Sequence, residues 1–141
     1  MPHEDQVLFL LIAGGRDFSN YEKLKELCDA YSTEFKWIIV ITGCAKGADI
    51  LGEKWALEKN VHNVIRFKPD WEKHGKKAGI LRNIEMVNYI KDKKNARVIC
   101  FWNGKSTGTA HTIKYSKEQG VPLIVFDYAG RETDYSNWPL K

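Results

Sequence analysis

Residues 7–15 read Val-Leu-Phe-Leu-Leu-Ile-Ala-Gly-Gly, and this stretch decides the fold class. Its first part, Val7–Ala13, is an unbroken apolar run in which apolar and polar positions do not alternate. A strand with one solvent-facing side alternates, whereas a strand of a parallel sheet is covered on both faces and reads as a continuous apolar run. We therefore predict that Val7–Ala13 is a strand of a parallel sheet and that a turn follows at Gly14-Gly15.

Apolar runs and helical spacings alternate along the rest of the chain. After residues 17–20, apolar side chains recur every three or four positions, as on one face of an amphipathic helix: Tyr21, Leu24, Leu27, Cys28 and Tyr31. Further strands are predicted at residues 37–41, 61–67, 97–102 and 121–126, and further helices at residues 48–58, 80–93 and 108–119. This order predicts an α/β fold with helices on both faces of a parallel sheet of about five strands.

Size and composition are those of one globular domain. The chain has 141 residues, of which 43% are hydrophobic and 28% charged, which is enough to bury a core. We expect one domain over residues 1–141, with its core at about 7–126 and an irregular tail at 127–141. No apolar stretch is long enough to span a bilayer, and the start Met1-Pro2-His3-Glu4-Asp5 lacks the basic residues of a signal peptide, so a cytoplasmic location is expected.

Cysteine, histidine and charge patterns narrow the functional classes. The 3 cysteines are widely spaced without a Cys-x-x-Cys pair, and the 4 histidines show no paired spacing, so neither a metal site nor a cofactor is expected. The formal net charge of +4 suits a phosphorylated ligand but is too small to indicate a nucleic-acid-binding arm.

Three polar turns follow predicted strands, at the edge where open parallel sheets bind ligands. The first, Gly14-Gly15-Arg16, lets the backbone approach a ligand closely and adds a guanidinium that suits a phosphate. The alternative is a tight turn with a solvated arginine. The third, Gly104-Lys105-Ser106-Thr107-Gly108-Thr109, offers hydroxyls, backbone NH groups and a cation for phosphate. It is not an ATPase loop, because Ile99 stands where that motif needs glycine.

The second turn, Gly43-Cys44-Ala45-Lys46-Gly47, leads into the predicted helix at residue 48, whose N-terminus favours an anion. Asp49 lies in the first turn of that helix, where it either contacts the ligand or stabilises the turn. Cys44 is also near the helix start, but no base accompanies it in the sequence. We interpret Cys44 as a packing residue rather than a nucleophile.

The segment between the second and third turns carries further candidates. Arg82 and Glu85 are three residues apart and lie on one side of a predicted helix, either as a salt bridge or as an anion-binding arginine with a carboxylate near a sugar. In the preceding loop, residues 68–78, Trp71 could stack on a base while Lys76-Lys77 meet phosphate. The alternative is a solvated basic loop with the tryptophan folded onto the core.

Together these motifs resemble the YspA-type branch of the SLOG superfamily. In chain order they are Gly14-Gly15-Arg16-Asp17-Phe18, Gly43-Cys44-Ala45-Lys46-Gly47-Ala48-Asp49, Gly79-Ile80-Leu81-Arg82-Asn83-Ile84-Glu85-Met86 and Gly104-Lys105-Ser106-Thr107-Gly108-Thr109. The resemblance covers residues 7–126 and implies a single Rossmann-like three-layer domain that binds a nucleotide or a nucleotide-derived ligand. It adds Asn83 to the expected ligand-binding residues, and it extends to the Lonely-guy phosphoribohydrolases and the DNA-processing protein DprA.

The resemblance leaves binding and catalysis open. Arg82-Asn83-Ile84-Glu85-Met86 looks like the Arg-x-x-Glu-Met element of the Lonely-guy enzymes, which cleave the N-glycosidic bond of nucleoside monophosphates. Their glycine-rich turn is followed by a glutamate pair, whereas here Ala110-His111-Thr112 follow, so the second acidic residue is missing. The first hypothesis is a module that senses or sequesters a phosphorylated nucleotide derivative. The alternative is an N-glycosidic hydrolase with Glu85 and Arg82 as its catalytic residues.

Two further expectations concern partners. A weaker alternative is single-stranded DNA that follows a row of cations, which the modest net charge disfavours: Lys73, Lys76, Lys77 and Arg82. Members of the superfamily commonly pair, so the resemblance implies a homo-oligomer. Its candidate interface residues are Trp55, Tyr89 and Tyr115.

Overall fold

The computed structural model describes residues 3–59 and 63–134, and it has the predicted alternation of strands and helices. In chain order the elements are η1 (Glu4–Gln6), β1 (Val7–Gly14), α1 (Tyr21–Glu34), β2 (Trp37–Thr42), α2 (Ala48–Glu58), β3 (Asn63–Arg66), α3 (Trp71–His74), η2 (Gly75–Lys77), α4 (Ala78–Ile90), β4 (Ala96–Phe101), α5 (Thr107–Glu118) and β5 (Leu123–Phe126).

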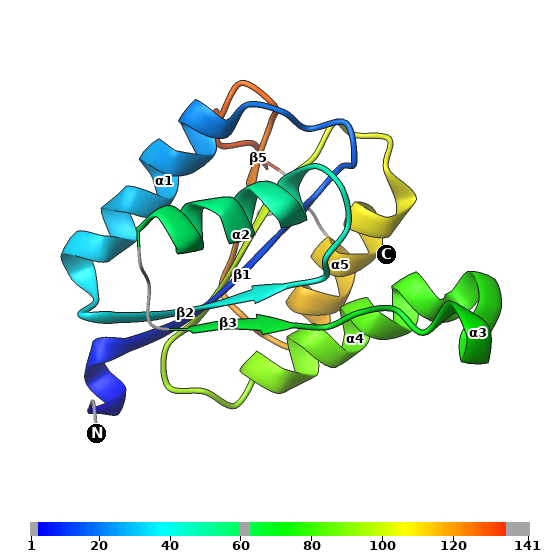
Figure 1. The fold of residues 1–141 in the computed structure, drawn as a ribbon, viewed down its shortest axis with the longest axis horizontal. Coiled ribbons are helices and arrows are strands. Elements are labelled where there is room, and N and C mark those ends of the chain that lie inside the picture. Colours follow the sequence, from blue (N-terminus) through cyan, green and yellow to red (C-terminus); the bar gives the residue numbers. More distant parts are fainter. Residues whose placement is uncertain (1–2, 60–62, 135–141) are drawn as a thin grey trace.

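The strands form one parallel sheet in the order β3-β2-β1-β4-β5 (Figure 1). The opening apolar run is β1, the middle strand, with Leu11 opposite Ile41 of β2 on one side and Val98 of β4 on the other. The prediction of an α/β, Rossmann-like fold with a parallel sheet of about five strands is therefore confirmed.

Helices cover both faces of the sheet (Figure 1). Leu10 and Ile12 of β1 pack with α1 and α2, while Leu11 and Ala13 pack with α4 and α5. Because successive side chains of a strand point to opposite faces, a strand between two helical layers needs apolar residues at every position. This arrangement accounts for the unbroken apolar run of β1.

The segment before α4 was expected to be a loop, and the structure corrects this. Residues 71–74 form the short helix α3, which η2 joins to α4 without a break. The side chain of Asp70 accepts a hydrogen bond from the Lys73 backbone NH at 3.1 Å and so caps α3. Asp is a preferred N-cap residue because it satisfies a helix NH group that has no partner within the helix.

Smaller differences concern the ends of elements. Helix α4 begins at Ala78 and ends at Ile90, rather than spanning residues 80–93. Strand β5 begins at Leu123, after Pro122, which has no NH group to donate to a neighbouring strand. The predicted third strand began at residues 61–62, which lie outside the described residues. Of the tail, residues 135–141 also lie outside them, while Glu132 forms an antiparallel bridge with Phe126.

The proposed interface residues lie in different environments. Trp55 is fully buried under α1, and its indole NH donates to the Asp29 carboxylate at 2.9 Å, so the expectation that it lines a subunit interface was wrong. Tyr89 is exposed and Tyr115 is half-buried, so a homo-oligomer stays a prediction. Within residues 3–59 and 63–134, every helix is too short or too polar to cross a bilayer.

Candidate functional site

The site lies where the chain changes direction across the sheet. Strands β1 and β4 are neighbours, but β1 leads to α1 on one face and β4 leads to α5 on the other. The two connections therefore diverge beyond the carboxyl ends of the strands and leave a crevice, which is where open α/β sheets bind ligands. A cleft of about 380 Å³ occupies this position.

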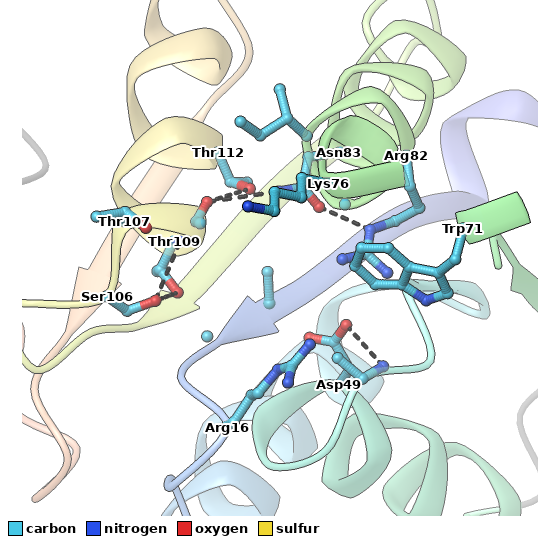
Figure 2. A pocket seen from close by; sticks show the side chains of 16 residues that line it. Arg16, Asp49, Trp71, Lys76, Arg82, Asn83, Ser106, Thr107, Thr109 and Thr112 are labelled. Atoms are coloured by element: carbon cyan, nitrogen blue, oxygen red, sulfur yellow. Dashed lines mark hydrogen bonds between the residues drawn. The ribbon is translucent and has the colours of Figure 1, made fainter. Parts of the chain in front are cut away.

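Four segments of the chain contribute side chains to this cleft, as Figure 2 shows. In chain order the lining residues are Ala13, Gly14, Arg16, Ala45, Asp49, Trp71, Lys76, Gly79, Ile80, Arg82, Asn83, Ser106, Thr107, Gly108, Thr109 and Thr112. All three polar turns predicted from the sequence thus reach one cleft.

The first two turns pack directly on each other. Gly47 has a φ of 82°, and a Cβ at this position would lie 2.2 Å from the carbonyl oxygen of Gly15. The Ala48 NH donates to the same oxygen at 3.4 Å. Gly15 and Gly47 do not line the first cleft, and the structure shows them holding the turns together.

Asp49 and Arg82 both line the cleft and both approach Gly43. The Asp49 carboxylate accepts a hydrogen bond from the Ala45 NH at 3.3 Å, and Arg82 donates from Nη1 to the Gly43 carbonyl. A Cβ on Gly43 would lie 2.8 Å from both Arg82 Nη1 and Asp49 Oδ2, so only glycine leaves room for both side chains. Arg82 Nε also donates to Asn83 Oδ1 at 2.8 Å, which holds its guanidinium toward the cleft.

The environment of Asp49 changes its acidity. Burial raises the pKa of this carboxyl from 3.8 to about 6, although Arg82 and the NH groups of residues 43 and 45 act in the opposite direction. Burial lowers the pKa of Arg82, while the negative charge of Asp49 raises it. The cleft thus holds a half-buried guanidinium near a carboxyl group whose pKa is raised to about 6.

The third turn reaches the cleft with only part of its length. Asn103 Oδ1 accepts from the backbone NH groups of Lys105 at 2.8 Å and Ser106 at 3.0 Å, which tightens the turn. Ser106 caps α5 by accepting from the Thr109 NH at 3.3 Å. Residues 106–109 line the cleft, whereas Gly104 and Lys105 were expected to bind ligand but are exposed outside it.

Glu85 lies away from the cleft. Arg82 and Asn83 line it, but Glu85 is exposed and forms no ion pair with Arg82 in the described part of the chain. Asn83, Met86 and Val87 define the buried side of α4, and Glu85 lies on the opposite side of Arg82 from them. A spacing of three residues placed Arg82 and Glu85 near each other but did not show which of them faced the sheet.

From the sequence, Trp71 and Lys76 were weighed as ligand contacts without being assigned to the site, and Ile80 and Thr112 were not proposed as site residues. All four side chains line the cleft. Trp71 is 51% exposed, so it is not folded onto the core, and Ile80 is 44% exposed. The signal in the sequence that pointed to Trp71 as a site residue was its position in a polar segment, where a large aromatic side chain has few apolar neighbours to pack against.

A second cleft of about 460 Å³ adjoins the first. Arg16, Ala45, Trp71 and Arg82 line both clefts. Five further residues line the second cleft but not the first: Gly43, Cys44, Lys46, Lys68 and Pro69. Burial raises the pKa of the Cys44 thiol, which favours its protonated form and agrees with a packing role.

Comparison with known proteins identifies relatives. Residues 9–74 match the family described as YspA, cpYpsA-related SLOG family, a range that contains the first two turns. The chain is 35% identical over 122 residues to the Gene 61 protein of Mycobacterium phage D29, covering 83% of this chain and 94% of that protein. No solved structure matches significantly.

Proposed function

The chain belongs to the YspA, cpYpsA-related SLOG family, and on this premise we propose that its cleft binds a nucleotide or nucleotide-derived phosphorylated ligand as a sensing or sequestering module. Membership of this family supports a nucleotide-related role in general. The choice of binding over catalysis, and of a phosphorylated ligand, depends on the residues of the cleft.

One observation carries the proposal, namely a group of basic side chains at the switch point of the sheet that outnumber the acidic ones. Five basic side chains line the two clefts: Arg16, Lys46, Lys68, Lys76 and Arg82. None of them forms a salt bridge within residues 3–59 and 63–134. Asp49 is the single acidic residue among the described lining, so the clefts attract anions.

Each part of a nucleotide finds a complementary group in this arrangement. The phosphate lies between Arg16 and Arg82, whose guanidinium groups suit phosphate oxygens. The base stacks on the exposed indole of Trp71. Thr107, an exposed residue at the start of α5, lines the same cleft and offers its hydroxyl to the sugar.

The test is to incubate the protein with nucleoside mono-, di- and cyclic phosphates while measuring thermal stabilisation and ligand integrity by chromatography. We expect stabilisation without ligand breakdown. Arg16→Ala removes an exposed side chain that forms no salt bridge with the described residues, and it should weaken binding roughly ten- to a hundredfold, the range for a lost charge-assisted hydrogen bond. The control is Lys114→Ala, an exposed lysine of α5 outside both clefts. Equal affinities in Arg16→Ala and Lys114→Ala would contradict the proposal.

The second candidate function is hydrolysis of the N-glycosidic bond of a nucleoside monophosphate. In this reaction water adds to the sugar carbon, the bond to the base breaks, and the base leaves with a proton. A carboxyl group must act beside the sugar. The observation that favours this candidate is Asp49, a buried carboxyl of the cleft with a pKa of about 6.

Free base in the incubated samples would distinguish the two functions. If the protein is a hydrolase that uses the cleft carboxyl, Asp49→Asn abolishes base release while Glu85→Gln retains it. If Glu85 is the catalytic residue, as the resemblance to the Lonely-guy enzymes implies, the two variants behave in the opposite way. Intact ligand in every sample would leave the binding module as the function.

A further inference from the structure

The two clefts share one wall, and that wall carries two arginines and a tryptophan. Arg16 and Arg82 line both clefts, and so does Trp71 with 51% of its surface exposed. Figure 2 shows all three side chains among those that line the first cleft. The guanidinium groups are therefore central to the combined site, with one cleft on each side of them.

Each cleft alone has the volume of a small binding site. The volumes are about 380 Å³ and about 460 Å³. Small-molecule sites span roughly 300–1,000 Å³, so one cleft accommodates one compact half of a ligand and the pair accommodates an extended one.

The two clefts differ in the chemistry of their outer walls. The first offers the hydroxyl-bearing start of α5, at Ser106, Thr107 and Thr109, together with the Asp49 carboxyl. The second offers Lys46 and Lys68 with the apolar ring of Pro69, and no acidic residue is among the described residues that line it. The two halves of one bound ligand would therefore lie in different surroundings.

Two separate phosphorylated ligands do not suit this geometry. If both used Arg16 and Arg82, the arginines that line both clefts, their like-charged phosphates would repel each other at the shared wall. A single ligand with its phosphates in the middle avoids this competition. Its two ends then occupy the two clefts, and each end is able to contact Trp71.

We propose that the ligand belongs to the dinucleotide class: two nucleoside-like halves joined through phosphate, with the phosphate on Arg16 and Arg82 and one half in each cleft. This inference rests on the proposed function and adds the ligand class to it. Trp71 provides a stacking surface at the junction, because an aromatic ring binds the face of any base.

The test compares ADP with diadenosine diphosphate, and GDP with diguanosine diphosphate, by isothermal titration calorimetry. Each pair has the same number of phosphates, but the dinucleotide carries less negative charge, so charge alone favours the mononucleotide. We expect at least one dinucleotide to bind about tenfold or more tightly than its mononucleotide, because joining two bound halves raises the effective concentration of the second.

A variant of the second cleft provides the matched measurement. Lys68 is exposed and lines the second cleft but not the first. Lys68→Ala should therefore lower the affinity for the dinucleotide more than the affinity for the mononucleotide. We expect the ratio of the two affinities to fall at least about threefold. Lys114→Ala should leave that difference unchanged. Circular dichroism confirms that both variants are folded.

The outcomes separate this inference from the function on which it rests. If mononucleotides bind but no dinucleotide binds more tightly, or if Lys68→Ala leaves the advantage of the dinucleotide intact, the dinucleotide class is overturned and the nucleotide-binding cleft stands. If none of the four nucleotides binds and the wider panel gives no stabilisation, both proposals fail together.

Discussion

Asp49 shows how one residue couples proton binding to the stability of this protein. Its side chain is 5% exposed, and burial raises its pKa from 3.8 to about 6. The folded state therefore binds a proton more tightly than the unfolded chain. The stabilisation from this group is fully present below a pH of about 3.8 and is lost as the pH rises through about 6.

Replacing this carboxyl tests the linkage. Asn mimics the neutral form at every pH and can still accept from the Ala45 NH, so Asp49→Asn should match wild type near pH 4 and exceed its free energy of unfolding by about 2–3 kcal/mol at pH 7. Urea denaturation at several pH values between 4 and 7 measures the difference. Parallel pH profiles would show that Asp49 is not shifted as described.

Gly43 is the second residue whose identity is explained by the site. Gly43→Ala adds a methyl group 2.8 Å from Arg82 Nη1 and Asp49 Oδ2, so one of these side chains must move. We expect a loss of about 1–3 kcal/mol in the free energy of unfolding, the usual cost of overpacking. Gly108→Ala is the matched control, because a Cβ there meets nothing within 4 Å. Equal stability of the two variants, measured by urea denaturation, would contradict this reading of the site.

At the scale of elements, helix α5 combines a structural and a proposed binding role at its first residues. Ser106 is the N-cap, and its hydroxyl accepts from the Thr109 NH while also lying 3.1 Å from the Thr109 hydroxyl. The same residues line the first cleft. The Ser106 side chain therefore both caps the helix and lines the cleft. Substitutions at this position should separate its effect on stability from its effect on ligand binding.

Two substitutions of Ser106 make that separation. Ser106→Ala removes the cap and should lower the free energy of unfolding by about 0.5–2 kcal/mol. Ser106→Asp keeps a capping side chain, which the helix dipole also favours, but places a negative charge in the cleft that is proposed to bind the phosphorylated ligand. We expect Ser106→Asp to retain stability and to weaken nucleotide binding by more than Ser106→Ala does. Thermal denaturation and calorimetric titration report the two effects separately.

At the scale of the whole molecule, the sheet between two helical layers sets the stability. Leu10 and Leu11 are adjacent in β1, both are fully buried, and they belong to the two opposite core clusters. A sheet with one solvent-facing side would bury only one of them. The site depends on this arrangement, because the cleft exists only where connections leave toward opposite faces.

The two leucines test the arrangement directly. Leu10→Ala and Leu11→Ala should each lower the free energy of unfolding by about 2–5 kcal/mol, because each leaves a cavity in a packed core. Leu57, which is 64% exposed on α2, serves as the control, and Leu57→Ala should change stability by less than about 0.5 kcal/mol. A small effect at either Leu10 or Leu11 would indicate that one face of the sheet is open.

The pattern of apolar residues within single segments was sufficient to predict the fold class and the polar turns that reach the cleft. The unbroken run of β1 requires two covered faces, and the helical spacing at residues 21–31 corresponds to α1. Arg16, Asp49, Arg82, Asn83 and residues 106–109 were all predicted, and all lie in the cleft. The turn positions follow from the sequence because parallel strands carry their following turns to the same edge, whereas Arg82 was weighed from its helical spacing and Asn83 was expected only from the family resemblance. That these residues bind a ligand stays a prediction.

Only the tertiary structure decided which side chains of those segments face the cleft. The strand order put the β1 and β4 turns together, and the packing of α4 buried Asn83 and Met86, which turned Glu85 toward solvent. The sequence by itself determined the two-sided sheet and the location of the turns, because these depend on periodicity within one segment. The rotation of α4 and the place of Trp71 on the shared wall depend on contacts between distant segments, which no local spacing contains.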